Sequence, residues 1–304
     1  MSGMISQLQA SRPTDLDAAL ALLAEAGDPW RPLAGGTDLL VEAQHGRLQH
    51  RRFLDLSGLQ GSLGGLRWHA DGTLEVGALC TYLQLQRDAR VQAEYPALCA
   101  MARLVGAAQI QARGTLAGNI ENASPAADVA PVLLALGARV RLQSAARGVR
   151  EVALDDYWTG YRQTVRGQDE LIVAVLVPPQ PFGPHAQWSR KVGTRSWQAI
   201  TKVGIAARIG WAEGRIVEAR IVAVSMAATP CRVAAIEQAL LGCSGEEPDL
   251  AARIATAQQS ALRPLDDVRS TAAYRATVFG RLVLQAVCET KGAAGDAGKG
   301  GSAA

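Results

Sequence analysis

Cysteine and aromatic residues are scarce in this sequence. Of its 304 residues, 5% are Phe, Trp or Tyr, and five are cysteines: Cys80, Cys99, Cys231, Cys243 and Cys288. No two of these form a C-x-x-C pair and no histidine stands at finger-like spacing, so we expect neither a zinc site nor an iron–sulfur cluster in this chain. An odd number of scattered thiols is typical of buried, unpaired side chains in a reducing compartment, which favours a cytoplasmic protein.

Long hydrophobic runs are also missing. Runs such as residues 130–138 and 171–177 fall far short of the roughly 20 residues that a membrane-spanning helix needs. Residues 1–12 contain no apolar block followed by a small-residue cleavage site, so they do not resemble a signal peptide. We expect no membrane span, and export would need the signal of a partner.

Neither sign of charge dominates the composition. There are 31 basic and 28 acidic residues without a long basic run, which gives no electrostatic support for nucleic-acid binding. The hydrophobic content of 48% suffices for a full core in two or three compact units. Residues 291–304 lack any large apolar side chain, and we expect this tail to be disordered.

The motifs of several common catalytic sites are absent. The sequence contains no G-x-G-x-x-G, G-x-x-x-x-G-K-[ST], G-x-S-x-G or H-E-x-x-H pattern, which leaves Rossmann, P-loop, hydrolase and zinc-protease sites without support. The four histidines are scattered, as is typical of surface or loop positions. We therefore predict no catalytic side chain and no metal ligand in this chain.

Two loops of small residues stand out instead. One is Thr115-Leu-Ala-Gly-Asn-Ile-Glu-Asn-Ala-Ser-Pro-Ala-Ala-Asp-Val-Ala-Pro131, in which glycine lets a ligand approach the backbone while Asn and Ser offer hydrogen-bonding groups. Turns of this composition also occur without a ligand. The other is Pro32-Leu-Ala-Gly-Gly-Thr-Asp-Leu-Leu40, which follows a short strand and opens a helix. Free N–H groups at a helix start bind anions, so this loop predicts a phosphate site.

Hydrophobic periodicity divides the first 180 residues into two α/β parts. In residues 1–60, Thr14 is the expected N-cap of a helix that carries leucines 16 to 23 and ends near Gly27. In residues 61–180, Thr81 is a second expected cap, helices are expected over 96–105 and 132–136, and the run 171–177 is typical of a buried strand.

The pattern changes in residues 181–290. Alternating side chains predict an antiparallel sheet whose last two strands are joined at Glu213-Gly214. The expected strands are 188–192, 200–211 and 216–226, and the expected helices are 232–241, 250–262 and 271–288.

Together the two loops resemble those of one family, the flavin-binding subunit or domain of the molybdenum hydroxylases, such as xanthine dehydrogenase and the carbon monoxide dehydrogenase medium subunit. The family patterns are close to A-G-G-T-D-L and T-[LI]-[GA]-G-N-[IL]-x-x-A-S-P-x-[AG]-D-x-x-P, and both occur here. The segments 156–162 and 267–275 resemble further family motifs, whereas Gln111 and Ala112 depart from the family's Q-I-R-N. The resemblance covers residues 16–284. It implies an α+β fold, with a two-part FAD-binding domain of the vanillyl-alcohol-oxidase (PCMH) type and a C-terminal domain of antiparallel sheet and helices.

The resemblance implies non-covalent FAD. Backbone N–H groups of the first loop would hold the pyrophosphate, and the Asp128 carboxylate would accept a hydrogen bond from the adenosine ribose. Lys191 would stabilise the reduced flavin and Ile172 would pack against its ring. The full set of cofactor-binding residues is then Leu33, Ala34, Gly35, Gly36, Thr37, Asp38, Thr115, Gly118, Asn119, Asn122, Ser124, Asp128, Ile172 and Lys191.

Four of these residues have alternative interpretations without a ligand. Asp38 would be repelled by a pyrophosphate, so we favour a helix cap or a loop hydrogen bond for its carboxylate. Asp128 could cap the helix that follows it. Lys191 could be solvent-exposed on a strand, and Ile172 could simply belong to the core of a buried strand.

The function implied by the resemblance is electron transfer. A molybdopterin-binding large subunit would oxidise the substrate, an iron–sulfur small subunit would relay the electrons, and reduced FAD here would pass them to NAD, a quinone, another carrier or oxygen. The complex would be a dimer of heterotrimers, with molybdopterin and iron–sulfur clusters only in the partner subunits. Two alternatives remain open: a self-sufficient flavin oxidase of a related fold, and an assembly protein that has lost the flavin.

Overall fold

The structure is a computed structural model that describes residues 8–196 and 198–300. Contacts within the chain divide it into two compact units. Unit 1 draws on Met1–Leu85, Ala108–Asn122 and Ala138–Pro179, and unit 2 on Gln86–Ala107, Ala123–Gly137 and Gln180–Ala304. The predicted second part, residues 61–180, is thus not one contact unit, because two of its helical segments pack with the C-terminal strands.

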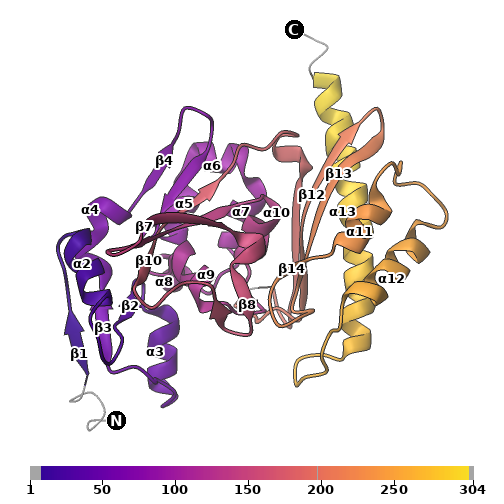
Figure 1. Ribbon diagram of the computed structural model, residues 1–304. Helices are drawn as coiled ribbons and strands as arrows, with labels where there is room; N and C mark the ends of the chain where they lie inside the picture. The colour runs from indigo at the N-terminus through magenta and orange to yellow at the C-terminus, as the bar shows by residue number, and fades with distance from the viewer. Residues whose placement is uncertain (1–7, 197, 301–304) are drawn as a thin grey trace. The chain divides into compact units, whose positions relative to one another are not determined.

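Unit 1 contains a three-stranded parallel sheet in the order β1-β3-β2 (Figure 1). Its elements are β1 (Gln9–Ser11), α2 (Leu16–Leu23), β2 (Arg31–Leu33), α3 (Thr37–Gln44) and β3 (Arg52–Asp55). The predicted helix is present, but the N-cap prediction of Thr14 is wrong. The cap is Asp15, whose carboxylate accepts a hydrogen bond from the N–H of Ala18 and satisfies a free donor of the first turn.

The larger sheet of unit 1 is antiparallel, in the order β4-β5-β10-β6-β7. Its strands are β4 (Leu66–Trp68), β5 (Leu74–Gly77), β6 (Arg139–Ser144), β7 (Gly148–Ala153) and β10 (Glu170–Val177). The central strand β10 is buried at all eight positions, as its apolar run predicted. The register of its pairing with β6 shifts between Ile172 and Ala174.

Short elements connect the strands of unit 1. They are the helices α4 (Gln60–Leu63), α5 (Tyr82–Arg87), α8 (Ala108–Gln111) and α9 (Leu116–Asn122), the 3₁₀ turns η1 (Leu56–Leu59) and η2 (Leu154–Asp156), and the hairpin β8 (Trp158–Gly160) with β9 (Gln163–Thr164). The predicted cap at Thr81 is confirmed. The Thr81 hydroxyl accepts from the N–H of Gln84, and the Gln84 side chain accepts from the N–H of Thr81.

Unit 2 is built on a four-stranded antiparallel sheet in the order β11-β12-β13-β14. Its elements are α6 (Ala89–Glu94), α7 (Pro96–Ala102), α10 (Ala130–Ala135), η3 (Pro184–Ala186), β11 (Gln187–Val192), β12 (Val203–Ala212), β13 (Arg215–Val224), β14 (Cys231–Arg232), α11 (Ala234–Leu240), α12 (Leu250–Ala261) and α13 (Ala272–Gly300). The predicted turn at Glu213-Gly214 joins β12 to β13, and both of its residues have positive φ. Such dihedrals suit the twist of a two-residue hairpin.

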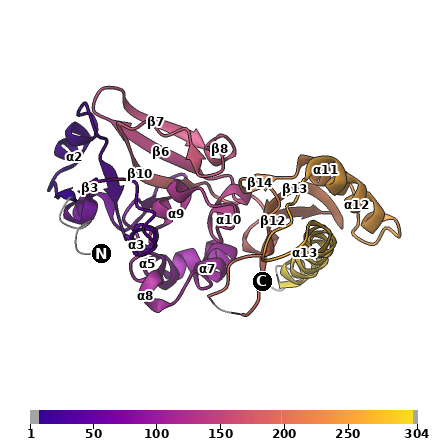
Figure 2. The same ribbon diagram turned by 90° about the horizontal axis from the view of Figure 1, so that it is seen from below.

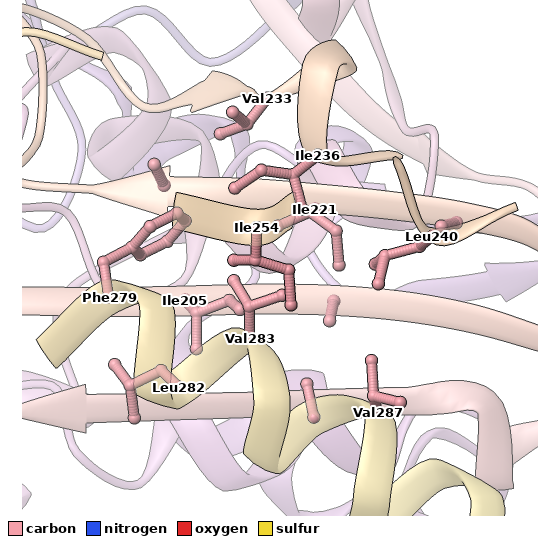
Figure 3. Packing of buried hydrophobic residues seen from close by; sticks show 14 of the residues in the cluster. Ile205, Ile221, Val233, Ile236, Leu240, Ile254, Phe279, Leu282, Val283 and Val287 are labelled. Carbon is pink, nitrogen blue, oxygen red and sulfur yellow. The ribbon is translucent and has the colours of Figure 1, made fainter. Parts of the chain in front are cut away.

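The main core of unit 2 lies between this sheet and the C-terminal helices. Figure 3 shows Ile205 of β12 and Ile221 of β13 facing Ile254 of α12 and Phe279 and Val283 of α13, and all five side chains are almost fully buried. Helix α10 packs on β12 and β13 from the other side, as Figure 2 shows. Strand β12 is therefore covered on both faces, which explains its long apolar sequence.

The tail differs from the prediction. Residues 291–300 continue α13 as a helix instead of being disordered. Extending an existing helix adds one hydrogen bond for each residue fixed, without a new nucleation cost, and alanine is the best helix former. Lys291 also forms an ion pair with Glu246. The remainder of the predicted tail, residues 301–304, lies outside the described residues. No helix in the described part of the chain is long and apolar enough to cross a membrane.

Candidate functional site

The first glycine loop connects β2 to α3 in unit 1. Gly36 is the N-cap of α3 and has a φ of 75°, a left-handed conformation that favours glycine. A Cβ at Gly35 would collide with the carbonyl oxygen of Arg113, so this glycine allows the first loop to touch the backbone that enters the second. The start of α3 thus presents free N–H groups, beginning at Thr37, on a tightly held loop.

The second loop opens α9, also in unit 1. The buried Thr115 hydroxyl accepts a hydrogen bond from the N–H of Gly118 at 3.0 Å, which fixes the first turn. A Cβ at Gly118 would lie 3.0 Å from the same hydroxyl, so the turn is tight on this side. The side-chain oxygen of Asn119 is buried and has no hydrogen-bond partner among the described residues. A buried acceptor without a donor is costly in a protein, and a ligand hydroxyl or N–H group would satisfy it.

The two loops are tied together by side chains. The Asn122 amide donates to the Asp38 carboxylate at 3.0 Å and accepts from the Arg162 guanidinium at 2.7 Å. The loop hydrogen bond favoured for Asp38 is therefore present, whereas its role as a cap is wrong because the N-cap is Gly36. Desolvation by the surrounding protein raises the pKa of the Asp38 carboxyl, and the attraction of Arg162 opposes this shift.

A pocket of about 420 Å³ lies beside this tie in unit 1. It is lined by side chains of both charges from α3, the end of α9 and the β8–β9 turn, including Arg31, Asp38, Glu42, Glu121, Asn122 and Arg162. The pocket therefore borders both predicted loops, at Asp38 and Asn122, and its lining is polar. Among the described residues, no group of three or more His, Cys, Asp or Glu side chains is arranged to hold a metal ion.

Two further predicted residues meet in unit 2. The Asp128 carboxylate accepts hydrogen bonds from the Lys191 ammonium and the Thr201 hydroxyl, both at 2.6 Å. Burial raises the pKa of the Asp128 carboxyl, while attraction and hydrogen bonds from these two partners lower it. Asp128 does not cap α10, because the cap position is Val129 and no side chain bonds there. Lys191 is not solvent-exposed, because its side chain is only 7% exposed.

The remaining predicted residues are less informative. The Ser124 hydroxyl accepts from the N–H of Ala126, which is a local turn contact in unit 2. Ile172 is a buried residue of β10 in unit 1 and pairs with Leu142 of β6. Leu33 ends β2 and Ala34 follows it, so both lead into the first loop.

Thr201, Glu121 and Arg162 also take part in these contacts, although they are not among the predicted site residues. Glu121 could have been noticed, because it is the single acid between Thr115 and Ala127 in a loop of otherwise small or uncharged residues. Arg162 belongs to a recognised segment without an assigned role. Thr201 stands just before a buried strand and carries no signal in the sequence that would connect it to Asp128.

Comparison with family models identifies the class of this protein. Residues 6–180 match the FAD-binding domain of molybdopterin dehydrogenases, and residues 188–290 match the C-terminal domain of the carbon monoxide dehydrogenase flavoprotein. The chain therefore belongs to the family of FAD-binding subunits of molybdenum-containing dehydrogenases. It is a flavoprotein subunit of an oxidoreductase, as the two loops predicted.

Individual relatives agree with this class. The chain is 34% identical to the xanthine dehydrogenase FAD-binding subunit of Escherichia coli O157:H7, over 75% of this chain and 77% of the relative. It is 31% identical to the caffeine dehydrogenase subunit beta of Pseudomonas sp. (91% and 92% covered), and 30% identical to the carbon monoxide dehydrogenase medium chain of Afipia carboxidovorans (92% and 95% covered).

Solved structures confirm the predicted fold class. The chain superposes on a chain of Cu,Mo-CO dehydrogenase with a TM-score of 0.87 and 27% identity, covering 94% of this chain and 98% of the other. Carbon monoxide dehydrogenase from Hydrogenophaga pseudoflava gives a TM-score of 0.87 at 26% identity, with the same coverage.

Proposed function

We propose that this chain is the electron-transfer subunit of a molybdenum hydroxylase complex. It accepts electrons from an iron–sulfur subunit and passes them from reduced FAD to NAD, a quinone, another carrier or oxygen. The observation that carries the proposal is the FAD-domain match over residues 6–180, which includes both glycine loops. The bound flavin supplies the redox chemistry, and the protein supplies binding, orientation and electrostatics.

The first loop is proposed to bind the pyrophosphate. Helix α3 begins directly after Gly36, so its free N–H groups and its dipole favour an anion there without any cationic side chain. The close contact of Gly35 with the backbone of Arg113 supports a loop held in one conformation. A rigid set of donors binds without a further ordering cost.

The second loop is proposed to bind the dinucleotide through Asn119. Its side-chain oxygen has a free acceptor position, and Thr115 and Gly118 hold the turn that presents it. Neither glycine loop contains His or Cys, which supports non-covalent attachment of the flavin.

The role of Asp128 as the ribose acceptor remains a proposal. Each of its oxygens accepts one bond from a protein donor, but an ionised carboxylate has about four acceptor positions, so the carboxylate keeps capacity for a hydroxyl. Lys191 is proposed to stabilise the anionic reduced flavin. The Lys191 side chain is buried, and its ion pair with Asp128 holds the ammonium in one orientation.

The proposed partners are an iron–sulfur small subunit and a molybdopterin-binding large subunit, in a cytoplasmic dimer of heterotrimers. Relatives named as a medium chain, or as subunits alpha and beta of a dehydrogenase, support an assembly of several chains.

Co-expression with the partner genes tests the proposal. We expect flavin absorbance in the purified complex, and bleaching of that absorbance when the substrate of the large subunit is added. The isolated chain should not turn over small alcohols, because such turnover would indicate a self-sufficient flavin oxidase instead. A chain that carries no flavin either alone or in the complex would contradict the proposal and support an assembly role.

A further inference from the structure

Three consecutive residues at the end of α9, Ile120, Glu121 and Asn122, are held by one neighbouring segment, residues 157–166. This segment contains the β8–β9 hairpin. The bonds are from the Trp158 indole to the Ile120 carbonyl oxygen (2.9 Å), from the Tyr157 hydroxyl and the Arg166 guanidinium to the Glu121 carboxylate (2.8 Å each), and from Arg162 to the Asn122 side-chain oxygen (2.7 Å). The whole end of the helix is therefore fastened by polar contacts.

Glu121 is the charged centre of this arrangement. Its side chain is 20% exposed and that of Arg166 is 10% exposed, so the ion pair is largely shielded from water. Burial alone would lower the pKa of Arg166, but the attraction and hydrogen bond of Glu121 raise it above its ordinary value. Burial and the neighbouring Glu121 charge both raise the pKa of Tyr157, which therefore remains a hydroxyl donor. Loss of the Glu121 charge would leave the Arg166 cation without its carboxylate partner.

The same residues reach the first glycine loop. The Arg31 guanidinium lies 3.9 Å from the Glu121 carboxylate, and Arg31 begins the strand β2 that leads into Gly35. The Asn122 amide donates to Asp38 in the first turn of α3. The first glycine loop is thus joined to the end of α9, which belongs to the second loop, through the side chains of Glu121 and Asn122.

Hydrophobic packing does not by itself fix the position of α3. Helix α3 has eight residues and none of them is buried, whereas the seven-residue α9 buries Leu116, Ala117 and Ile120. Helices shorter than about 12–15 residues are marginal by themselves in water. Polar contacts such as Asn122–Asp38 must therefore contribute to the position of α3 on α9. The β8–β9 turn contains Arg162 in a left-handed conformation, with a φ of 54°, and such strain persists where the surroundings fix it.

We propose that Glu121 and Asn122 are positioning residues for FAD binding. They hold the two glycine loops at a fixed separation by fastening both to the hairpin β8–β9, and they need not touch the flavin themselves. This inference rests on the proposed function, in which the loops bind FAD.

The first test is Glu121→Gln in the full-length chain, with FAD affinity measured by fluorescence titration. The amide has nearly the same shape, but it removes the charge that pairs with Arg166. We expect FAD affinity to fall at least about tenfold and the visible circular dichroism of the bound flavin to change. The matched control is Glu94→Gln, which removes the charge of an exposed i,i+4 pair with Arg90 and should leave both readouts unchanged.

A double-mutant cycle separates positioning from general stability. Asn122→Ala and Arg162→Ala should each weaken FAD binding by about five- to tenfold, and the double variant should be no weaker than the poorer single variant, because both remove the same contact. Independent, multiplicative effects would overturn the proposed coupling. If Glu121→Gln does not fold, this cycle decides the proposal.

The outcomes also distinguish this proposal from the proposed function. If Glu121→Gln lowers only the melting temperature, and its folded fraction binds FAD with unchanged affinity and an unchanged dichroism spectrum, the residue is merely structural and the positioning proposal is wrong. If Gly36→Asp abolishes FAD binding while the Glu121 and Asn122 variants bind normally, the flavin site stands and the positioning role falls. If Gly36→Asp also leaves FAD binding unchanged, the assignment of the first glycine loop to the pyrophosphate is wrong.

Discussion

Lys191 and Asp128 form an ion pair of 2.6 Å in which neither side chain is more than 13% exposed. The two residues are 63 positions apart in the sequence, and the Thr201 hydroxyl completes the contact. A buried pair of this kind is costly to break, because the remaining partner keeps its charge without compensation. Loss of either partner alone should therefore destabilise unit 2, apart from any contact with the cofactor.

We expect Lys191→Met to destabilise the protein by about 3–5 kcal/mol at neutral pH, measured by urea unfolding. The matched control is Lys291→Ala in the same unit. Its ion pair with Glu246 has the same 2.6 Å distance but is much more exposed, so its removal should cost no more than about 1 kcal/mol. Equal losses in the two variants would contradict the importance of burial.

The pH dependence of the Lys191→Met variant follows from the same pair. Burial raises the folded-state pKa of Asp128, and removing the ammonium takes away the attraction that opposes this shift. A carboxyl whose folded pKa is raised contributes stability below its unfolded pKa and loses that contribution as the pH rises through the folded value. The deficit of the variant relative to the wild-type protein should therefore be largest at neutral pH and shrink toward pH 4.

Much of the local fold could be predicted from the sequence, because local physics determines it. The predicted cap at Thr81 is present, and Glu213-Gly214 forms the expected hairpin turn. The apolar run of β10 is buried at every position. In each case the residue type and its immediate neighbours restrict the backbone, so no knowledge of the remaining chain is needed.

The contacts between distant segments could not be predicted in this way. Thr201 bonds Asp128 across 73 positions and Arg162 bonds Asn122 across 40, and neither pair leaves a periodic pattern in the sequence. The N-cap of α2 was also predicted wrongly, because the neighbouring side chains of Thr14 and Asp15 can each cap a helix. Tertiary geometry decides such cases.

The lowered pKa of Glu247 predicts that unit 2 loses stability in acid, separately from the effect of Asp128. Its carboxylate accepts the N–H groups of Ser244 at 2.5 Å and Gly245 at 3.0 Å, and these bonds lower its pKa from 4.5 to about 2. A depressed carboxyl pKa contributes stability above the unfolded value, which is lost as the pH falls from 4.5 toward 2. We expect Glu247→Gln to lower the melting temperature at pH 7, and this difference to disappear near pH 2. A difference that is constant across the range would rule out the Glu247 charge as its source.

Asn119 should separate cofactor binding from stability. Its buried side-chain oxygen has no partner among the described residues, so Asn119→Ala removes an unsatisfied acceptor from the flavin-free protein. We expect the flavin-free variant to be at least as stable as the wild-type protein, yet to bind FAD about tenfold more weakly, a loss of one hydrogen bond of roughly 1.4 kcal/mol. Thermal unfolding without FAD and a fluorescence titration with FAD measure the two effects. Unchanged affinity would show that the Asn119 oxygen does not contact the cofactor.

The Gly36 position offers the sharpest test of the pyrophosphate site. Alanine is a poor control there, because the φ of 75° is strained for it and its Cβ would lie 3.3 Å from the Leu33 side chain. Asparagine tolerates the left-handed region better and has the shape of aspartate, so Gly36→Asn and Gly36→Asp differ almost only in charge. A carboxylate next to a pyrophosphate in a partly desolvated loop should cost a few kcal/mol, so we expect the Asp variant to bind FAD roughly a hundredfold more weakly than the Asn variant. Both variants should have similar melting temperatures without FAD. Equal flavin content in the two would place the pyrophosphate elsewhere.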